Sequence, residues 1–568
     1  MREAPHVILY GDSICHEYAS RLATYLADRI RSFPCTIKNM GIVGETSADA
    51  LLRLETVANT PGNVVVIHLG MNDWRKGIPP DQFGDNIRQM VRRLVSVDRR
   101  VILATITPDW NGRGFALSRQ DRQGTSPEVD VYNRVLWEIG RTEKVRVADP
   151  NGLWRERIQP PWKGLKDAIH PNTLGQEVIC EALYYMVSRD HLTIVWPFFG
   201  RFAACNYECP YCYVPLSVNK GSRAIHSIEE WGEGFLHSFG EHQRLTFYLS
   251  FGEPTIARTF MPLIEMVGAH PNWDVMITSN LSMKKLDRLI NTRLVQDGRL
   301  NINASFHPTE TSREAFLEKL LQLRGAGIDC PVVYVAYPPL IPRLEDDIDF
   351  FGQYKFVVHV RRFRGWHNRR YYPEAYAEAE RAAAARFMDT ASIRYMLSNV
   401  SSLGRRTFLG MHHILVNEKG DVELCDEYPG ERNLGNVFRG DVQLYSLPQP
   451  FPGPVSLGAV DDVANIVELG YEELDGNHVL SFARQGGVYL DGGHVRYPYR
   501  NANFDEALWE KLLTVPPAEH VQTPGWFFRH RLWIHGLERN WIRGREFLRG
   551  KTRLWRQGRL TLRDSYHS

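Results

Sequence analysis

The first 365 residues alternate between short apolar runs and stretches with helical apolar spacing, and this alternation narrows the possible folds most. Runs such as His6–Tyr10, Val64–Leu69 and Val101–Ile106 indicate buried strands. Strand–helix alternation gives parallel sheets covered by helices, with active sites at the carboxyl ends of the strands. Because 568 residues exceed what one hydrophobic core usually serves, we expect two or three domains.

Four short polar blocks stand at predicted strand or loop ends within residues 1–190. They are Gly11–Ser13, Gly41–Gly44, Gly70–Asp73 and Asp167–His170. Each block alone has a simpler explanation as turn glycines, helix caps or, for Asp73, a loop carboxylate. In this order the four blocks resemble the SGNH (GDSL-type) hydrolase family. The resemblance implies a flavodoxin-like three-layer α/β/α domain that acts as an ester hydrolase or acyltransferase.

The residue types in these blocks suit acyl transfer. A serine hydroxyl needs a base, and His170 supplies an imidazole that Asp167, three residues earlier, can hold in the correct tautomer. By resemblance, Ser13 is the nucleophile, and the oxyanion donors are the backbone N–H groups of Ser13 and Gly44 and the side-chain amide of Asn72. Each such donor lowers the barrier by roughly 3 kcal/mol. All four blocks are intact, so we expect an active enzyme whose acyl group the sequence leaves open.

Three cysteines, Cys205, Cys209 and Cys212, form a C-x3-C-x2-C array directly after the apolar run Leu192–Phe199. Three thiolates can hold three irons of a [4Fe-4S] cube and leave the fourth iron open. The alternative is zinc, which prefers four ligands in two close pairs, and the sequence has no second pair. With Tyr211 before the last cysteine, the array resembles the radical S-adenosylmethionine (SAM) signature, in which the open iron binds SAM.

Further strand-like runs extend this region to about residue 365 and, with the run before the cysteines, make six β/α units. Such units predict a partial (β/α)6 barrel with its chemistry at the strand C-termini, and the radical SAM family is built in this way. The runs are Leu245–Leu249, Val275–Thr278, Leu300–Ser305, Val332–Ala336 and Phe356–Val360.

Ser250–Pro254 resembles the Gly-Gly-Glu-Pro motif that receives the SAM amino group, with Phe251 in place of the first glycine. Gly252 still lets the backbone approach a ligand, and by resemblance Glu253 supplies the carboxylate. The resemblance implies a [4Fe-4S] cluster and SAM as cofactors, and an electron donor such as flavodoxin or ferredoxin as a partner. It also implies reductive cleavage of SAM to a 5′-deoxyadenosyl radical that abstracts hydrogen from the substrate.

Polar residues end two later strands of the predicted barrel. Ser279 and Asn280 end the third strand, and Ser305 ends the fourth. By resemblance these residues meet the ribose or the methionine carboxylate of SAM. A strand-to-helix cap is the alternative for each.

Ile414–Cys425 predicts a hairpin that resembles the start of a SPASM-type extension, so residues 366–510 are expected to form a smaller α+β extension. Cys425 alone cannot hold the auxiliary cluster that such extensions carry in relatives. Two roles remain open for Cys425. It is either a buried apolar residue or a thiol that returns hydrogen to the substrate radical, which would make the reaction an epimerisation.

The last segment, residues 511–568, is basic and rich in aromatic residues. Trp533, Leu537, Trp541 and Leu548 recur at near-helical spacing with arginines between them. This pattern predicts a helix docked on its own protein. The alternative is peripheral contact with an anionic membrane surface or a lipid-linked substrate.

Composition limits the partners and the compartment. The chain has 68 Lys and Arg against 66 Asp and Glu, so its net charge of +2 does not favour nucleic acid. We find no signal-peptide core at the N-terminus and no apolar run near the ~18 residues of a membrane span. Eight cysteines, three of them clustered, suit a reducing compartment, so we expect a cytoplasmic protein.

The sequence therefore predicts a bifunctional enzyme with domains at 1–190, 191–365, 366–510 and 511–568. The expected substrate is a carbohydrate-type or small metabolite, such as an acylated glycan, because fusion of two active sites suggests successive steps on one molecule. The alternative is a radical SAM maturase of a short peptide, in which the hydrolase domain acts as a hydrolase or as a binding module.

Overall fold

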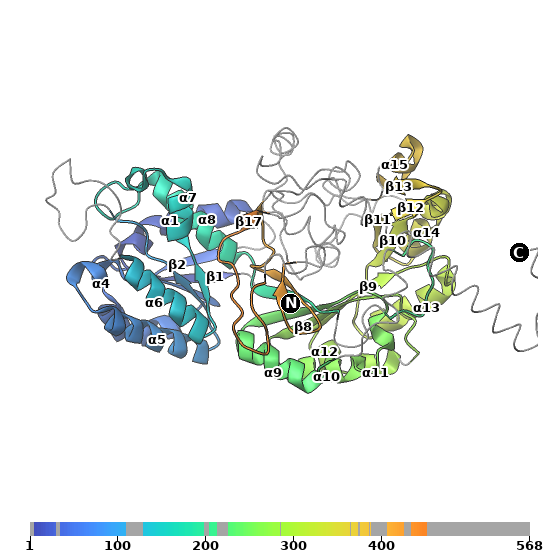
Figure 1. Ribbon diagram of the computed structural model, residues 1–568, viewed down its shortest axis with the longest axis horizontal. Helices are drawn as coiled ribbons and strands as arrows, with labels where there is room; N and C mark the ends of the chain where they lie inside the picture. The colour runs from blue at the N-terminus through green and yellow to red at the C-terminus, as the bar shows by residue number, and fades with distance from the viewer. Residues whose placement is uncertain are drawn as a thin grey trace, which may run out of the picture.

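The computed structural model describes two α/β units that lie beside one another (Figure 1). The predictions for Cys425, for the tail and for the boundary at residue 510 fall outside the described residues. The described residues are 5–29, 35–109, 129–197, 204–212, 225–284, 286–363, 365–372, 375–385, 387, 406–424 and 433–450.

The N-terminal unit is built on a five-stranded sheet. Its strands are β1 (His6–Gly11), β2 (Thr36–Asn39), β3 (Val64–His68), β4 (Arg100–Ala104) and β5 (Arg146–Ala148). All neighbours pair in parallel in the order β2-β1-β3-β4-β5. This order is that of a flavodoxin-like sheet, in which ligands bind at the switch point between β1 and β3. The predicted fold of this domain is confirmed.

Helices cover both faces of this sheet. Figure 1 shows α1, α7 and α8 on one side of the strands and α4, α5 and α6 on the other. The helix α5 buries apolar residues at helical spacing, among them Phe83, Ile87, Met90 and Leu94, and so gives one apolar face to the sheet. The helices are α1 (Ser13–Arg29), α2 (Ser47–Leu52), α3 (Leu54–Asn59), α4 (Met71–Lys76), α5 (Pro80–Ser96), α6 (Val129–Thr142), α7 (Pro150–Arg157), η2 (Pro161–Gly164) and α8 (Thr173–Val187).

The second unit contains an eight-stranded sheet. Its strands are β6 (His191–Val195), β7 (Arg244–Leu249), β8 (Trp273–Ser279), β9 (Leu300–Ser305), β10 (Val332–Ala336), β11 (Val358–Arg362), β15 (His413–Val416) and β16 (Val422–Glu423). The order is β11-β10-β9-β8-β7-β6-β15-β16, and the six strands from β6 to β11 are parallel. The hairpin predicted at Ile414–Cys425 is present as β15 and β16. It continues the same sheet, because β15 pairs in parallel with β6.

Helices alternate with the parallel strands of the second unit. They are α9 (Ile228–Phe239), η4 (Pro254–Ile256), α10 (Phe260–Ala269), α11 (Leu286–Ile290), α12 (Arg293–Gln296), α13 (Arg313–Gly325), η5 (Pro338–Leu340), α14 (Ile341–Gln353) and α15 (Glu378–Ala385). Short strands complete the described part, namely β12 (Gly365–His367), β13 (Arg370–Tyr372), β14 (Arg406–Thr407) and β17 (Gln449–Pro450).

The two faces of the second sheet differ in polarity, because successive side chains along a strand point to opposite faces. One face is apolar and joins the core formed with the helices, through residues such as Ile194, Phe247 and Ile302. The intervening residues form what we call the polar face of the sheet. Its members include Thr193, Thr246, Asn301, Asn303, His359 and Arg361.

One segment, residues 406–416, packs into both units. Phe408 and Met411 belong to the core of the N-terminal unit, whereas Ile414 and Val416 belong to the core of the second unit. His412 in this segment is buried, and its Nε2 lies 2.6 Å from the Tyr185 carbonyl. In the described part, none of the helices is both long and apolar enough to cross a bilayer.

Candidate active site

A chain of hydrogen bonds links Asp167, His170 and Ser13 at the switch point of the first sheet. His170 Nε2 lies 3.0 Å from Ser13 Oγ, and His170 Nδ1 lies 2.8 Å from Asp167 Oδ2. Because a carboxylate can only accept, Nδ1 carries a proton and Nε2 is left to accept the proton of the serine hydroxyl. Residues far apart in sequence thus form one serine–histidine–aspartate arrangement, which has the geometry of a nucleophile, a base and an orienting carboxylate.

Local structure fixes both ends of this arrangement. Ser13 begins α1 directly after β1, and it is buried. Gly11 ends β1 where a Cβ would lie 2.3 Å from the His68 carbonyl oxygen, so only glycine fits there. On the opposite side, the side chain of Asn172 caps α8, and this helix start anchors the loop Asp167–His170.

The carboxylate of Asp167 is held in its charged form. Partial burial opposes the charge, but the N–H groups of Ile169 and His170 donate to Asp167 Oδ1 at 2.9 and 2.8 Å. Together with the imidazole, these donors lower the pKa of Asp167 below its usual value. A charged Asp167 stabilises the imidazolium that forms when His170 takes a proton.

The three predicted oxyanion donors come from different elements. The Ser13 N–H lies in the first turn of α1, where N–H groups have no acceptor within the helix. Gly44 lies in the turn after β2, with φ +77 and open space around its α-carbon. Asn72 Nδ2 donates to the Glu45 carbonyl at 2.9 Å and to Asp12 Oδ2 at 3.4 Å. The amide is thus tied to the neighbours of both Ser13 and Gly44, while its role in catalysis stays a prediction.

Three buried carboxyl groups lie behind the serine, and the sequence did not reveal them as a group. Burial raises the pKa of Asp12 to about 7. Glu45 is paired with Arg53, whose Nε donates to Glu45 Oε1 at 2.5 Å. Asp73 is not a loop carboxylate. It lies fully buried in α4 and accepts the Ser47 N–H at 2.9 Å, because a buried carboxyl group needs donors of its own.

The three predicted cluster cysteines lie on one loop after β6. The Cys212 N–H donates to the Cys209 carbonyl at 3.1 Å, and the Tyr207 N–H donates to Cys205 Sγ at 3.4 Å. Burial, and to a smaller extent Glu310 and the other two thiols, raise the pKa of Cys209 to about 12.

Within the described ranges, no group of three His, Cys, Asp or Glu side chains is placed to hold a metal ion. The [4Fe-4S] cube, in which each cysteine takes an iron of its own, and zinc, the alternative left open by the sequence, both stay predictions.

The predicted SAM residues after β7 and β8 contact one another. Ser279 Oγ donates to Glu253 Oε1 at 2.8 Å, and the Asn280 N–H donates to Glu253 Oε2 at 2.6 Å. Thr255 also donates to Oε1, through its N–H at 3.2 Å. Asn280 Nδ2 lies 3.9 Å from Cys205 Sγ, which joins this group to the cysteine loop. Glu253 Oε2 keeps capacity for a second donor, as an ammonium group would require.

Phe251 and Gly252, in the segment that resembles the glycine motif, have an unusual backbone conformation. Phe251 has φ +69 and Gly252 has φ +80, so both lie in the left-handed region. For a residue other than glycine this region costs on the order of 1–3 kcal/mol, and such strain gathers at functional sites. The chain therefore holds Phe251 where a glycine would rest without strain.

Two further predicted residues, Tyr211 and Ser305, lie apart from Glu253 and its hydrogen-bond partners, which we call the Glu253 group. The Tyr211 hydroxyl lies 3.1 Å from His307 Nδ1, and the two rings stack with centroids 5.8 Å apart. Tyr211 is buried in the apolar core, so it fastens the cysteine loop to the strand-end residue His307. Ser305 ends β9, and among the described residues no hydrogen bond joins it to Glu253 or to the cysteines.

Comparisons with known proteins concern the N-terminal unit. Residues 9–178 match the GDSL-like Lipase/Acylhydrolase family. An isoamyl acetate-hydrolyzing esterase 1 homolog of Rattus norvegicus is 27% identical over 210 residues, which cover 33% of this chain and 82% of that protein. An arylesterase of Vibrio mimicus is 25% identical over 149 residues, covering 26% of this chain and 66% of that protein.

Solved structures give matches of the same extent. The alpha/beta hydrolase LAE5 from the metagenome of Lake Arreo is 20% identical, with a TM-score of 0.28, and covers 32% of this chain and 95% of that chain. The acetylxylan esterase Axe2 of Geobacillus stearothermophilus is also 20% identical with a TM-score of 0.28, and covers 32% and 92% of the two chains.

The matched segment coincides with the unit that holds Ser13, His170 and Asp167. Residues 9–178 thus form an SGNH (GDSL-type) hydrolase domain with the chemistry of an esterase or acylhydrolase. The family match ends before β6, so the second unit is interpreted from its own residues.

Proposed function

We propose that this chain is a bifunctional enzyme in which a serine ester hydrolase or acyltransferase is fused to a radical SAM enzyme. For the first activity, the observation that carries the proposal is the unbroken hydrogen-bond chain from Asp167 through His170 to Ser13. For the second, it is the cysteine loop beside the Glu253 group.

In the hydrolase, Ser13 Oγ attacks the ester carbonyl carbon while His170 Nε2 takes the hydroxyl proton. The oxyanion is bound by the N–H groups of Ser13 and Gly44 and by the Asn72 amide. His170 then protonates the leaving alcohol, and the acyl-serine remains. Water completes hydrolysis, or the hydroxyl group of a second substrate completes acyl transfer.

A small acyl group on a hydroxyl-rich carrier is the substrate class we propose. The similar esterases named for isoamyl acetate and aryl esters support small esters. Ile42 and Val43 are 48% and 72% exposed beside Gly44, and they offer an apolar edge for an acyl chain. The polar face of the second sheet supports a hydroxyl-rich carrier, such as a carbohydrate, for the partner domain.

Ester hydrolysis tests the first activity. The native chain should hydrolyse p-nitrophenyl acetate, and Ser13→Ala should lose about 10⁶-fold in kcat, because no other group replaces the nucleophile. Ser96→Ala is the matched control, since Ser96 is exposed and its hydroxyl bonds, in the described part of the chain, only to Arg93. Equal rates in the native chain and in Ser13→Ala would refute the assignment.

In the second unit, Cys205, Cys209 and Cys212 would hold the cluster, and Glu253 and Asn280 would bind and orient SAM beside it. The cluster and SAM supply the one-electron chemistry when bound. The residues of the chain would position the ligand. Glu253 Oε2 would accept a hydrogen bond from the ammonium group of SAM, and Asn280 links Glu253 to the cysteine loop.

Anaerobic reconstitution with iron and sulfide tests the second activity. A brown protein that forms 5′-deoxyadenosine from SAM only with a reductant is expected. Cys209→Ala should lose the cluster absorbance and the product, whereas Cys330→Ala, a buried cysteine outside the loop, should keep both. A colourless native protein after reconstitution would end this half of the proposal.

Two accessory proposals concern residues outside the described ranges. Cys425 would return a hydrogen atom to the substrate radical and become a thiyl radical, which one electron from the proposed flavodoxin or ferredoxin and one solvent proton convert back to the thiol. Solvent deuterium then enters the product, and Cys425→Ala abolishes its incorporation. The tail at 526–568 would contact an anionic membrane surface. Flotation with liposomes should then be lost when the tail is removed, and flotation that persists without the tail would contradict this role.

A further inference from the structure

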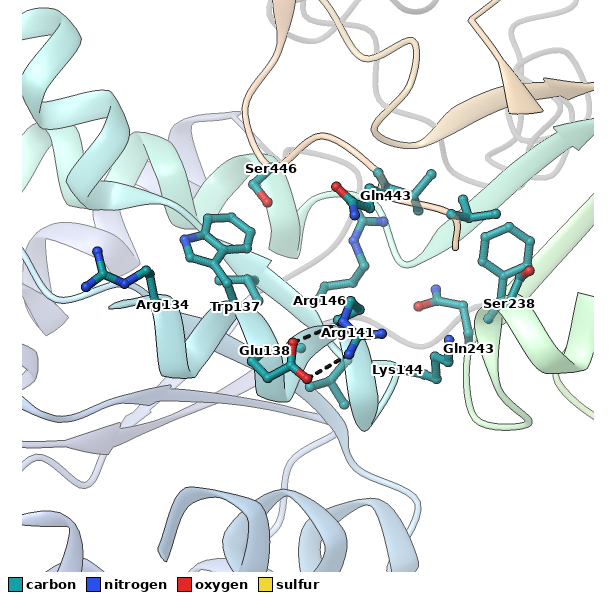
Figure 2. A pocket seen from close by; sticks show the side chains of 16 residues that line it. Arg134, Trp137, Glu138, Arg141, Lys144, Arg146, Ser238, Gln243, Gln443 and Ser446 are labelled. Atoms are coloured by element: carbon teal, nitrogen blue, oxygen red, sulfur yellow. Dashed lines mark hydrogen bonds and ion pairs between the residues drawn. The ribbon is translucent and has the colours of Figure 1, made fainter. Parts of the chain in front are cut away.

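A cavity of about 530 Å³ lies between the two units (Figure 2). The N-terminal unit contributes α6 and the start of β5, and the second unit contributes the end of α9 and the turn before β7. Residues 442–446 close the third side. The volume lies within the range of small-molecule sites.

The lining of the cavity is basic. It holds Arg134, Arg141, Lys144 and Arg146 but only one acidic side chain, Glu138. The guanidinium of Arg141 donates two hydrogen bonds to the carboxylate of Glu138, at 3.0 and 2.7 Å, which are shown by dashed lines in Figure 2. Three cationic side chains of the lining are therefore left without a carboxylate from the lining itself.

Arg146 is the central group of this lining. Figure 2 shows its side chain reaching from β5 toward the loop that carries Gln443. Its guanidinium donates to the Tyr445 carbonyl at 3.4 Å, and among the described residues it has no carboxylate partner. Burial and the neighbouring Arg100 lower the pKa of Arg146 to about 9, yet the group stays charged at neutral pH. The Arg146 side chain is half-buried, and a partly buried charge that lacks a counterion favours binding of an anion.

We propose that this cavity binds an organic phosphate of mononucleotide size. The planar guanidinium of Arg146 can donate two parallel hydrogen bonds to two oxygens of one phosphate group, and Lys144 adds a second positive charge. Trp137 is 37% exposed at the edge of the cavity and offers a ring face on which a base can stack. Gln243 and Gln443 place amide groups in the lining that can bond a sugar or a base.

The cavity lies at the strand ends that face away from both candidate active sites. Arg146 is the first residue of β5, whereas Ser13 follows the last residue of β1. Gln243 precedes β7, whereas the cysteine loop follows β6. Catalysis in such sheets occurs at the carboxyl ends of strands, so the cavity is a separate binding site at the joint between the units.

Equilibrium dialysis of the full chain against adenosine monophosphate tests the proposal. The nucleotide should bind the native chain, and Arg146→Gln and Lys144→Gln should each weaken binding at least about tenfold. Arg92→Gln removes the same charge from an exposed pair with Glu143 and should bind as the native chain does. Lys144 is the second variant because it lies between α6 and β5, whereas Arg146 belongs to β5, so its substitution does not alter a strand residue. Thermal melting checks that each variant is folded.

Trp137→Leu and two simpler anions separate the parts of the proposed ligand. Trp137→Leu should weaken binding of adenosine monophosphate several-fold but leave binding of inorganic phosphate unchanged. Inorganic phosphate and citrate should bind the native chain more weakly than the nucleotide. Equal affinity for all three anions would overturn the nucleotide class. If Arg146→Gln and Lys144→Gln are folded and bind adenosine monophosphate as tightly as the native chain does, the proposed site is wrong. This result would also be obtained if the nucleotide bound at the proposed SAM site instead.

Discussion

The serine site and the cysteine loop both lie at the carboxyl ends of parallel strands, but they differ in how complete they are. In the serine site, Asp167, His170 and Ser13 bond directly to one another. In the cysteine loop, the Tyr207 N–H donates to Cys205 Sγ at 3.4 Å, and the Asn280 amide lies 3.9 Å from the same sulfur. One site carries its reacting groups in the chain, and for the other we propose that the thiols are ligands of a cofactor.

This difference determines what geometry alone can establish. A nucleophile, a base and an orienting acid must be in hydrogen-bond reach, so their distances test the assignment directly. Ligands of a cube are each placed against a different iron, so distances between the thiols and other side chains say little. The hydrolase is accordingly supported by both geometry and family, whereas the radical enzyme stays a proposal.

Of the variants that test this comparison, Asp167→Asn should have the largest effect on ester hydrolysis. A small effect would contradict the view that the serine site is the more complete of the two. The asparagine keeps the shape but can present an N–H to His170 Nδ1, which favours the wrong tautomer. We expect kcat for ester hydrolysis to fall about 10⁴-fold. Formation of 5′-deoxyadenosine should not change. A loss below tenfold would mean that His170 is oriented by other groups and that the serine site is less complete than its distances indicate.

Asn72→Ala should give the next largest effect and sharpens the account of the oxyanion donors. Removing one donor costs about 10²–10³ in kcat with little change in KM, since the donor acts on the charge of the transition state. Steady-state kinetics with p-nitrophenyl acetate would measure both constants. Lys76→Gln, which removes a surface side chain bonded to the Gly44 carbonyl at 3.0 Å, serves as the control for general disturbance of the loop. An equal loss in both variants would count against a specific role of Asn72.

Asp12 gives a pH test of the buried carboxyl groups behind Ser13. Its pKa is raised to about 7 by burial, so between pH 4 and 7 the folded state binds a proton that the unfolded state has lost. The native chain therefore loses stability as pH rises through this window, and Asp12→Asn lacks this loss. Between pH 5 and pH 6.5 the free energy of unfolding of the variant should gain about 2 kcal/mol relative to the native chain.

Denaturant titrations at the two pH values would measure this difference. The comparison of slopes is independent of any constant cost of the substitution, such as an unfavourable contact with Asn72. A difference that stays constant with pH would show that Asp12 is charged in the folded protein at both pH values. The cations beside this group of acids, such as Arg53 paired with Glu45, would then be sufficient to keep Asp12 charged as well.

The strands were accessible from sequence because they depend on local patterns, and the contact of Asp167, His170 and Ser13 was accessible through the family resemblance of the blocks that hold them. The strands Leu300–Ser305 and Val332–Ala336 occur with the predicted bounds. The predicted run Phe356–Val360 began two residues early, since apolar residues precede the true strand Val358–Arg362. The three-residue strand β5 gave too short a pattern to detect, although its first residue, Arg146, lines the cavity.

Long-range pairings could not be predicted in the same way. The parallel pairing of β15 with β6 joins residues more than 200 positions apart, and no local pattern encodes it. The burial of Asp73 against Ser47 depends equally on tertiary packing. One signal was readable: Thr46 and Asp49 have the spacing of a capping box, which marks the start of α2 and fixes the residues after Gly44.

Two helix caps give the smallest effect and compare the two units directly. Thr46 caps α2 and Ser227 caps α9, each in a capping box with an acidic residue three positions later. Thr46→Ala and Ser227→Ala should each cost about 1 kcal/mol of stability, measured as the shift of the unfolding transition. Only Thr46→Ala should also lower kcat for ester hydrolysis, by a few-fold, because Thr46 follows Glu45, whose carbonyl holds the Asn72 amide. If Ser227→Ala lowered ester hydrolysis as well, the two units would be coupled through their joint, and the serine site could no longer be treated as complete within its own domain.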